Sequence, residues 1–313
     1  MPPSKSPVRF ISTDYDGTFS RPGSSEIYES HFFDRLREWN KHERVYWAVN
    51  TGRNLLSVES ELRHRGAPYM PDFLITIERE VYQRQGASFS MGLYKPWGDW
   101  NQVCSDRHAK LYATTEQLWV DARRWLREHT HANVMVDPGS PIGMIARDEE
   151  EAARIVQYMT ELLEGYPGVK LVHNSIYFRF SHEDYNKGTA MHAVANSLGI
   201  PVDQVFAAGD HSNDIPMLNT RYAGHLACPG NATAEVKHLV LSQGGYLATA
   251  HNGEGTLEAL EYIFTGKDVR HPEDGTVVDS AEEERVYQSQ IRSIAQESFP
   301  EERESDAALK AER

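Results

Sequence analysis

The sequence predicts an α/β protein: a Rossmann-like, doubly wound parallel sheet that carries an inserted α+β domain. Two observations lead to this fold class. At both ends of the chain, short apolar runs without helical period alternate with helical patterns, which is typical of βαβ units in a parallel sheet. Between them the pattern changes to two hairpins that each follow a helix, which indicates a compact αββαββ insert. The length of 313 residues is sufficient for both parts.

The core is expected to comprise residues 1–80 and 185–266. Its apolar runs at residues 8–11, 45–49 and 205–208 each lead into a polar loop. In a parallel sheet the carboxyl ends of the strands meet at one edge, where functional groups gather. We expect core strands near 8–11, 45–49, 72–77 and 205–208, and core helices near 27–42, 187–198 and 253–264.

Residues 81–184 are expected to form the insert, and residues 267–313 an acidic tail. The tail has 7 basic and 13 acidic residues, hence a net charge of −6, and few apolar residues. We interpret it as flexible or as a surface helix. The insert should contain helices near 115–129 and 148–164 and strands near 133–136, 142–146, 169–172 and 176–180.

Composition argues against several classes of protein. The net charge of −14 disfavours binding to nucleic acid and to anionic lipid. No run approaches the roughly 18 to 20 apolar residues of a membrane span, and the first residues lack the apolar stretch of a secretory signal. Cys104 and Cys228 are far apart, which indicates neither a disulfide framework nor a zinc site. We expect a cytoplasmic monomer or homodimer.

The first polar loop carries two carboxylates. Asp14 and Asp16 are two residues apart after a strand, so both side chains emerge on the same side of the chain. Adjacent carboxylates repel each other unless a cation or a shared proton compensates, and Mg²⁺ prefers such hard oxygen ligands. One carboxylate can attack phosphorus while the other protonates the leaving alcohol. Gly17 suits a tight turn and Thr18 adds a hydroxyl, although a surface turn is the alternative interpretation.

A second acidic cluster follows the strand at 205–208. Asp210 and Asp214 are four residues apart, so on a helix they face one side and can complete a magnesium site. The alternative interpretation is an acidic helix cap. Two acidic clusters at two strand ends are less easily produced by chance than one.

A phosphate group needs hydrogen-bond donors and positive charge. Thr51 and the backbone of Gly52 lie where a strand meets a helix, which is a natural anion site. Lys187, at the start of another helix, can neutralise the nucleophile and the phosphoryl oxygens. Taken alone, a lysine in that position is more often a solvated residue at the end of a helix.

Four motifs in this order resemble the haloacid dehalogenase superfamily: DYDGT (14–18), NTGR (50–53), NKGTAM (186–191) and GDHSNDIPML (209–218). The insert between the second and third motifs is similar to the αββαββ cap of the type IIB, Cof-like branch, and the resemblance covers about residues 6 to 265. It implies a phosphatase with Mg²⁺ as cofactor and a small phosphate ester as substrate. The implied roles are nucleophile for Asp14, general acid and base for Asp16, phosphate clamps for Thr51 and Lys187, magnesium ligands for Asp14, the Asp16 carbonyl and Asp210, support of the metal for Asp214, and phosphate positioning for Asn213.

Within that branch, residues 71–76 and Asp99-Trp100 are similar to sucrose-phosphate phosphatases, which implies a sugar phosphate as substrate. The stretch Ile77-Glu78-Arg79-Glu80 departs from the pattern, because those enzymes usually carry a glycine-containing turn there. Dehalogenation is disfavoured, since the dehalogenases lack the second aspartate that Asp16 supplies. Candidate sugar contacts in the insert, with core packing as the alternative, are Trp97, Trp100, Tyr177 and Arg179.

Two other functions stay open. A phosphomutase of the phosphomannomutase type uses the same aspartates and the same type of cap. It would need a cationic cap surface, and the insert shows no obvious cluster beyond Arg123, Arg124 and Arg127. A catalytically inactive binding protein on the same fold is the other alternative, although every chemical position is intact.

Overall fold

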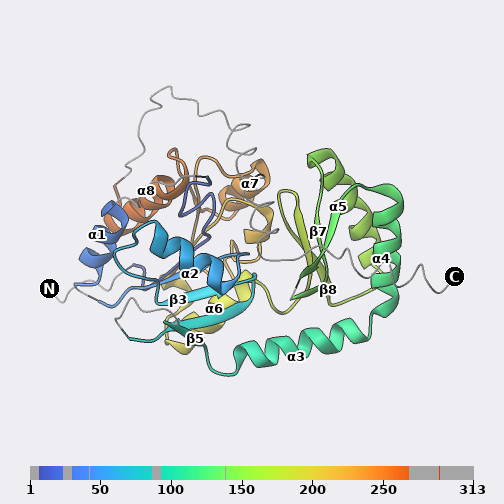
Figure 1. Cartoon of the computed structure of the whole chain (residues 1–313). Coiled ribbons are helices and arrows are strands. Elements are labelled where there is room, and N and C mark those ends of the chain that lie inside the picture. The colour runs from blue at the N-terminus through green and yellow to red at the C-terminus, as the bar shows by residue number, and fades with distance from the viewer. Residues whose placement is uncertain are drawn as a thin grey trace. The chain divides into compact units, whose positions relative to one another are not determined.

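A computed structural model of the chain describes residues 7–23, 30–41, 43–86, 93–137 and 139–267, together with residue 289. The chain divides into two compact units, and the second of them is drawn in the green part of the colour scale in Figure 1. Among the described residues, the first unit holds 7–104 and 185–267, and the second holds 105–184. The acidic tail expected at 267–313 lies outside the described residues, except for its first residue and residue 289.

One sheet forms the centre of the first unit. Its strands are β1 (Phe10–Thr13), β2 (Tyr46–Asn50), β3 (Phe73–Thr76), β4 (Glu80–Arg84), β5 (Tyr94–Pro96), β10 (Val205–Ala208), β11 (His225–Cys228) and β12 (Tyr246–Leu247). Their spatial order is β12-β11-β10-β1-β2-β3-β4-β5. The strands from β12 to β3 pair in parallel, and β4 and β5 extend the sheet in antiparallel pairing.

Helices cover both faces of this sheet, because successive side chains of each strand point to opposite faces. Ile11 of β1 lies in a core cluster with residues of α1, α2 and α8, whereas its neighbour Phe10 lies in a cluster with residues of α6 and α7. This arrangement confirms the predicted doubly wound sheet. The helices of the unit are α1 (Ser30–Trp39), α2 (Leu55–His64), α6 (Lys187–Ser197), α7 (Ala234–Ser242) and α8 (Asn252–Thr265).

The topology gathers polar loops at one edge of the sheet. β1 is one of the two central strands of the parallel part, with Thr13 paired to Ala208 of β10 and to Val49 of β2. The loops that follow β1, β2 and β10 therefore leave the sheet at neighbouring positions. Asp14 is the first residue after β1, and its N–H extends the pairing by donating to the carbonyl of Ala208 at 2.9 Å.

The second unit is an antiparallel sheet packed against two helices. Its elements are α4 (Glu116–His129), β6 (Asn133–Asp137), β7 (Ser140–Ile145), α5 (Glu149–Leu163), β8 (Val169–Asn174) and β9 (Tyr177–His182). The spatial order β6-β7-β9-β8 and one shared apolar cluster, to which both helices contribute, confirm the predicted αββαββ architecture. α3 (Trp100–Ala113) precedes these elements and runs from the first unit into the second.

The boundary of the insert differs from the one that we placed at residue 81. Residues 81–104 group with the first unit, because β4 pairs with β3 and β5 pairs with β4 at the edge of the large sheet. The sequence signal for these strands is weak, since segments of five and three residues offer little period to detect. Among the described residues, no helix combines the length and the apolar character that a membrane crossing requires.

A buried carboxylate on α8 stabilises the loop that follows β12. Glu258 is 6% exposed and accepts hydrogen bonds from the N–H groups of Thr249 and Ala250 and from the hydroxyl of Tyr246. Replacing Glu258 would remove the charged acceptor of these part-buried hydrogen bonds, and a hydrogen bond to a charged group contributes about 1.5 to 3 kcal/mol.

We expect Glu258→Ala to lower the free energy of unfolding by about 3 kcal/mol or more. Glu254→Ala is the matched control, because Glu254 is an exposed glutamate in the first turn of the same helix. Its effect should stay within about 0.5 kcal/mol. Urea unfolding followed by circular dichroism measures both values, and equal effects would contradict the role of the Glu258 carboxylate.

Candidate active site

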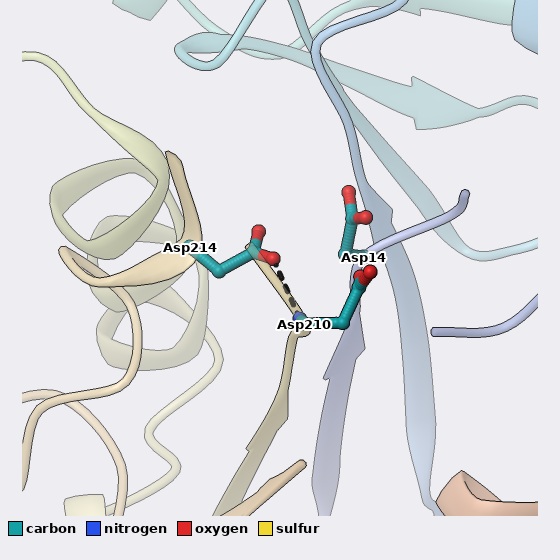
Figure 2. Close-up of side chains that lie close together, drawn as sticks. All are labelled: Asp14, Asp210 and Asp214. Carbon is teal, nitrogen blue, oxygen red and sulfur yellow. Dashed lines mark hydrogen bonds between the residues drawn. The ribbon is translucent and has the colours of Figure 1, made fainter. Parts of the chain in front are cut away.

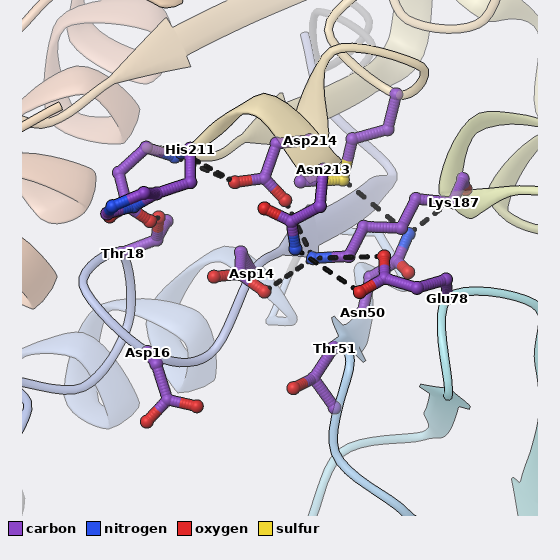
Figure 3. Close-up of polar contacts among 12 residues, drawn as sticks. Asp14, Asp16, Thr18, Asn50, Thr51, Glu78, Lys187, His211, Asn213 and Asp214 are labelled. Atoms are coloured by element: carbon purple, nitrogen blue, oxygen red, sulfur yellow. Dashed lines mark hydrogen bonds and ion pairs between the residues drawn. The ribbon is translucent and has the colours of Figure 1, made fainter. Parts of the chain in front are cut away.

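Lys187 is the centre of the candidate site. Its ammonium is fully buried and donates to Asp14 Oδ1 at 2.6 Å and to Asp214 Oδ1 at 2.7 Å (Figure 3). The position of Lys187 depends on the start of α6, where the Asn186 side chain accepts from the N–H of Thr189 and the Thr189 hydroxyl accepts from the N–H of Asn186. This capping box defines the first turn of the helix, and Lys187 is its first residue.

The loop after β10 brings two more carboxylates to this point. Asp214 lies in the 3₁₀ turn Ser212–Asp214, where its Oδ2 accepts from the N–H groups of Asp210 at 2.9 Å and His211 at 3.1 Å. Asp210 accepts from the Thr18 hydroxyl at 2.6 Å and forms a 2.6 Å hydrogen bond with Nδ1 of His211. Both carboxylates are buried, so each has a defined orientation.

Asp14, Asp210 and Asp214 form a compact group of buried carboxylates (Figure 2). One oxygen from each lies within 4.8 Å of the others. Burial raises the pKa of Asp14 well above its ordinary value, and the charges of Asp214 and Asp210 raise it further, although Lys187 lowers it. Burial also raises the pKa of Asp210. Three carboxylates with one ammonium are short of positive charge, and a hard divalent cation with oxygen ligands fits this donor set.

Two glycines make this close approach possible. A methyl group built on Gly17 would lie 2.2 Å from Asp210 Oδ2, and the positive φ of +80° at Gly17 also disfavours any other residue. A methyl group built on Gly209 would lie 2.4 Å from Cβ of Asp214. The loops of the first and fourth motifs therefore depend on glycine for steric reasons.

Asp16 lies outside the group of three carboxylates. Arg53 Nε and Nη2 donate to its two oxygens, each at 2.7 Å, and Asp16 points away from Asp14 (Figure 3). Burial lowers the pKa of the Arg53 guanidinium, but the charge and hydrogen bonds of Asp16 more than offset this effect and raise the pKa. Arg53 therefore stays charged and holds Asp16 beside the nucleophile loop.

The expected phosphate contacts lie at the ends of β2 and β10. Thr51 is 2% exposed, and its hydroxyl accepts from the N–H of Arg53 at 3.1 Å. Asn213 is also buried, and its Nδ2 faces Glu78 Oε1 at 3.3 Å. Of the expected phosphate contacts, Lys187 touches Asp14 directly, and Gly52 lies against Glu78, the carboxylate that also faces Asn213.

Glu78 enters the same region from the turn after β3. It is 5% exposed, and its Oε2 lies 3.8 Å from Lys187 Nζ. Both Ile77 and Glu78 have positive φ values, of 43° and 72°, which cost about 1 to 3 kcal/mol each for residues other than glycine. This strained turn occupies the place where the sequence departs from the glycine-containing pattern.

The four candidate sugar contacts divide between the units. Trp97 and Trp100 belong to the first unit and pack against its core, and Trp100 Nε1 donates to the carbonyl of Arg79 at 2.8 Å. Tyr177 and Arg179 belong to β9 of the second unit. Both bind the buried Asp137, through the Tyr177 hydroxyl at 2.6 Å and Arg179 Nε at 3.1 Å.

Sequence reasoning missed the roles of Arg53, Glu78 and His211 in this site. Arg53 lies inside the NTGR motif and His211 inside GDHSND, so motif membership was an available signal for both. Glu78 could be noticed only as a departure from the glycine-containing turn. The spacing of residues along the chain does not predict the contacts of Arg53 with Asp16, of Glu78 with Asn213 or of His211 with Asp210, because they depend on the tertiary fold.

Comparisons with known proteins agree with this fold. A family model described as haloacid dehalogenase-like hydrolase matches residues 111–254. A phosphoglycolate phosphatase from Methanospirillum hungatei is 30% identical over 109 residues, which are 35% of this chain and 44% of the relative. Another, from Archaeoglobus fulgidus, is 34% identical over 103 residues, 33% of this chain and 43% of the relative. The match with each covers less than half of the relative's length.

Solved structures extend the likeness over most of the chain. The sucrose-phosphatase from Synechocystis, solved with sucrose and phosphate, superimposes with a TM-score of 0.59 at 18% identity and covers 82% of this chain and 98% of that one. A Bacteroides thetaiotaomicron protein described among phosphatases of the haloalkanoate superfamily gives a TM-score of 0.55 at 17% identity, with 84% and 97% covered. At these identities the likeness shows the fold. The family model and the relatives add a sequence similarity to haloacid dehalogenase-like hydrolases and phosphatases over part of the chain.

Proposed function

We propose that this chain is a Mg²⁺-dependent phosphatase that hydrolyses a small phosphorylated metabolite through a phosphoryl group carried on Asp14. The observation that carries the proposal is the contact of Asp14 with a fully buried lysine, next to two further buried carboxylates. Relatives named phosphoglycolate phosphatase and a structural neighbour named sucrose-phosphatase support the same class of reaction.

Each group has a role in the proposed first step. The Asp14 carboxylate attacks phosphorus, the bond from phosphorus to the leaving oxygen breaks, and a protonated Asp16 gives its proton to that oxygen. Lys187 orients Asp14 and stabilises the charge on the phosphoryl oxygens, and donors at Thr51, Gly52 and Asn213 hold them. Asp16 has to turn from Arg53 toward the leaving oxygen, and the two-point contact with Arg53 supplies its resting position.

In the second step, Asp16 takes a proton from a water molecule that attacks phosphorus. The bond between phosphorus and Asp14 breaks, and inorganic phosphate leaves. Asp14, Asp210 and Asp214 would hold the Mg²⁺ ion, with the backbone carbonyl of Asp16 as the additional ligand that the family resemblance implies. When bound, the ion supplies positive charge next to the phosphoryl oxygens.

We also propose a sugar phosphate as the substrate class. Support comes from the likeness of residues 71–76 and Asp99-Trp100 to sucrose-phosphate phosphatases and from the structural likeness to the enzyme solved with sucrose. Because several relatives are named phosphoglycolate phosphatase, phosphoglycolate is the substrate to compare with sugar phosphates. Recognition of the leaving group by the insert belongs to this proposal.

Asp14→Asn is expected to lower kcat by about a thousandfold or more, because an amide cannot serve as the nucleophile. Asp34→Asn is the matched control, since Asp34 is an exposed aspartate on α1, and it should keep the activity of the unaltered protein. Phosphate release from a panel of sugar phosphates and phosphoglycolate, with and without Mg²⁺, measures both variants. Turnover by Asp14→Asn that matches the control would exclude Asp14 as nucleophile.

The stabilising effect of Mg²⁺ should increase with pH. In the metal-free protein the raised pKa of Asp14 favours its protonated form. The stability that this form contributes is fully present below 3.8, the ordinary pKa of an aspartate. It is lost as the pH rises through the raised pKa of Asp14 in the folded protein. A divalent cation binds the ionised carboxylates and must displace these protons at low pH. The rise in Tm on adding Mg²⁺ should therefore be larger at about pH 8 than at about pH 5.5.

Differential scanning fluorimetry with and without Mg²⁺ gives this comparison directly. Asp210→Asn removes one proposed ligand and should reduce the rise in Tm at both pH values. A rise that is the same at both pH values, or that Asp210→Asn leaves intact, would contradict a metal site at these carboxylates.

A further inference from the structure

The turn after β3 is held in an unusual conformation by the neighbouring loop. The N–H of Ile77 donates to the carbonyl of Arg53 at 3.0 Å, and the N–H of Glu78 donates to the carbonyl of Thr51 at 3.2 Å. These bonds attach the turn to the loop that follows β2, although Ile77 and Glu78 both have positive φ values. A strained turn that persists at a functional site is a reason to look for a role of its side chain.

The Glu78 carboxylate meets three of the four residues assigned to phosphate. Oε1 accepts from Asn213 Nδ2 at 3.3 Å, and Oε2 lies 3.8 Å from Lys187 Nζ (Figure 3). A methyl group built on Gly52 would lie 2.6 Å from Oε1, so this carboxylate also borders the Gly52 backbone. Glu78 thus places an anion against donors that a phosphoryl group would use.

The negative charge of Glu78 affects how strongly this region can bind an anion. Lys187 already contacts two other carboxylates, those of Asp14 and Asp214. An additional carboxylate at the same ammonium repels an arriving phosphate dianion and competes with it for Asn213. A purely structural role for Glu78 makes the opposite prediction, because loss of its support would then disorder Asn213 and weaken anion binding.

We propose that Glu78 is a specificity-determining residue that weakens the affinity of this site for inorganic phosphate. Its carboxylate holds Asn213 until a phosphoryl group displaces it, and it returns when phosphate leaves. An ester that gains affinity from its organic part then binds in preference to free phosphate. This inference rests on the proposed function, since it assumes that Thr51, Gly52, Lys187 and Asn213 receive the phosphoryl group.

The test is the binding of inorganic phosphate to the full chain in the presence of Mg²⁺, measured by isothermal titration calorimetry. Glu78→Gln removes the charge with little change of shape, and Glu78→Asn also withdraws the side chain while tolerating a positive φ. We expect both variants to bind phosphate about tenfold more tightly. Glu80→Gln, at the start of β4 just after the turn, is the control and should change the Kd by less than about twofold, because the Glu80 carboxylate accepts from the Tyr82 hydroxyl instead.

A second readout uses p-nitrophenyl phosphate as a generic phosphomonoester. The inhibition constant of inorganic phosphate should fall in the same proportion as its Kd in the two Glu78 variants. Unchanged or weaker phosphate binding by folded Glu78→Gln and Glu78→Asn, in an otherwise active protein, overturns the role of Glu78 alone. Absence of both phosphate binding and turnover in the unaltered protein overturns the proposed function and this inference together.

Discussion

The buried ammonium of Lys187 is the constraint on which the site depends. A charge that is fully removed from water must be neutralised by partners, and Lys187 has the carboxylates of Asp14, Asp214 and Glu78 around it. Burial lowers the pKa of this ammonium, but the three carboxylates raise it well above its ordinary value. Removing one partner of such a buried pair typically costs about 3 to 5 kcal/mol, so the ammonium and the carboxylates stabilise each other's positions.

This constraint also explains why the sheet topology matters. The partners of Lys187 follow β1, β3 and β10, and Lys187 itself begins α6 after the insert. The parallel order β10-β1-β2-β3 brings these chain segments to one edge. Glycine at positions 17 and 209 then allows side chains to approach where any other residue would collide. An excess of negative charge results, which a divalent cation is suited to balance.

In the second unit, a buried arginine and a buried aspartate form an ion pair with each other. Arg179 is 2% exposed, and Asp137 and the Tyr177 hydroxyl are within hydrogen-bonding or ion-pair distance of it. Burial raises the pKa of Tyr177, so this hydroxyl stays protonated and donates to Asp137. The two insert residues that we considered as sugar contacts are therefore held within a network of their own unit, as buried polar groups require.

Much of the fold followed from local signals in the sequence. Apolar runs at 8–11 and 205–208 and the helical pattern from 187 lie within one or two residues of β1, β10 and α6, because period and composition are properties of short segments. Elements without a clear period escaped this reasoning. α3 has no distinct apolar stripe, and its Val103 is exposed, so no helical period marks it. β5 has only three residues, which is too short for a period.

The sequence by itself determined the fold class, the order of the four motifs and the choice of acidic and basic residues at the ends of the strands, since these depend on residue type and spacing along the chain. Only the tertiary structure decided that Asp16 binds Arg53, that Glu78 joins Lys187 and Asn213, and that Trp97 and Trp100 pack in the first unit. Asp16 and Arg53 are 37 positions apart in the sequence, and Glu78 and Asn213 are 135 apart, so no local pattern encodes these contacts.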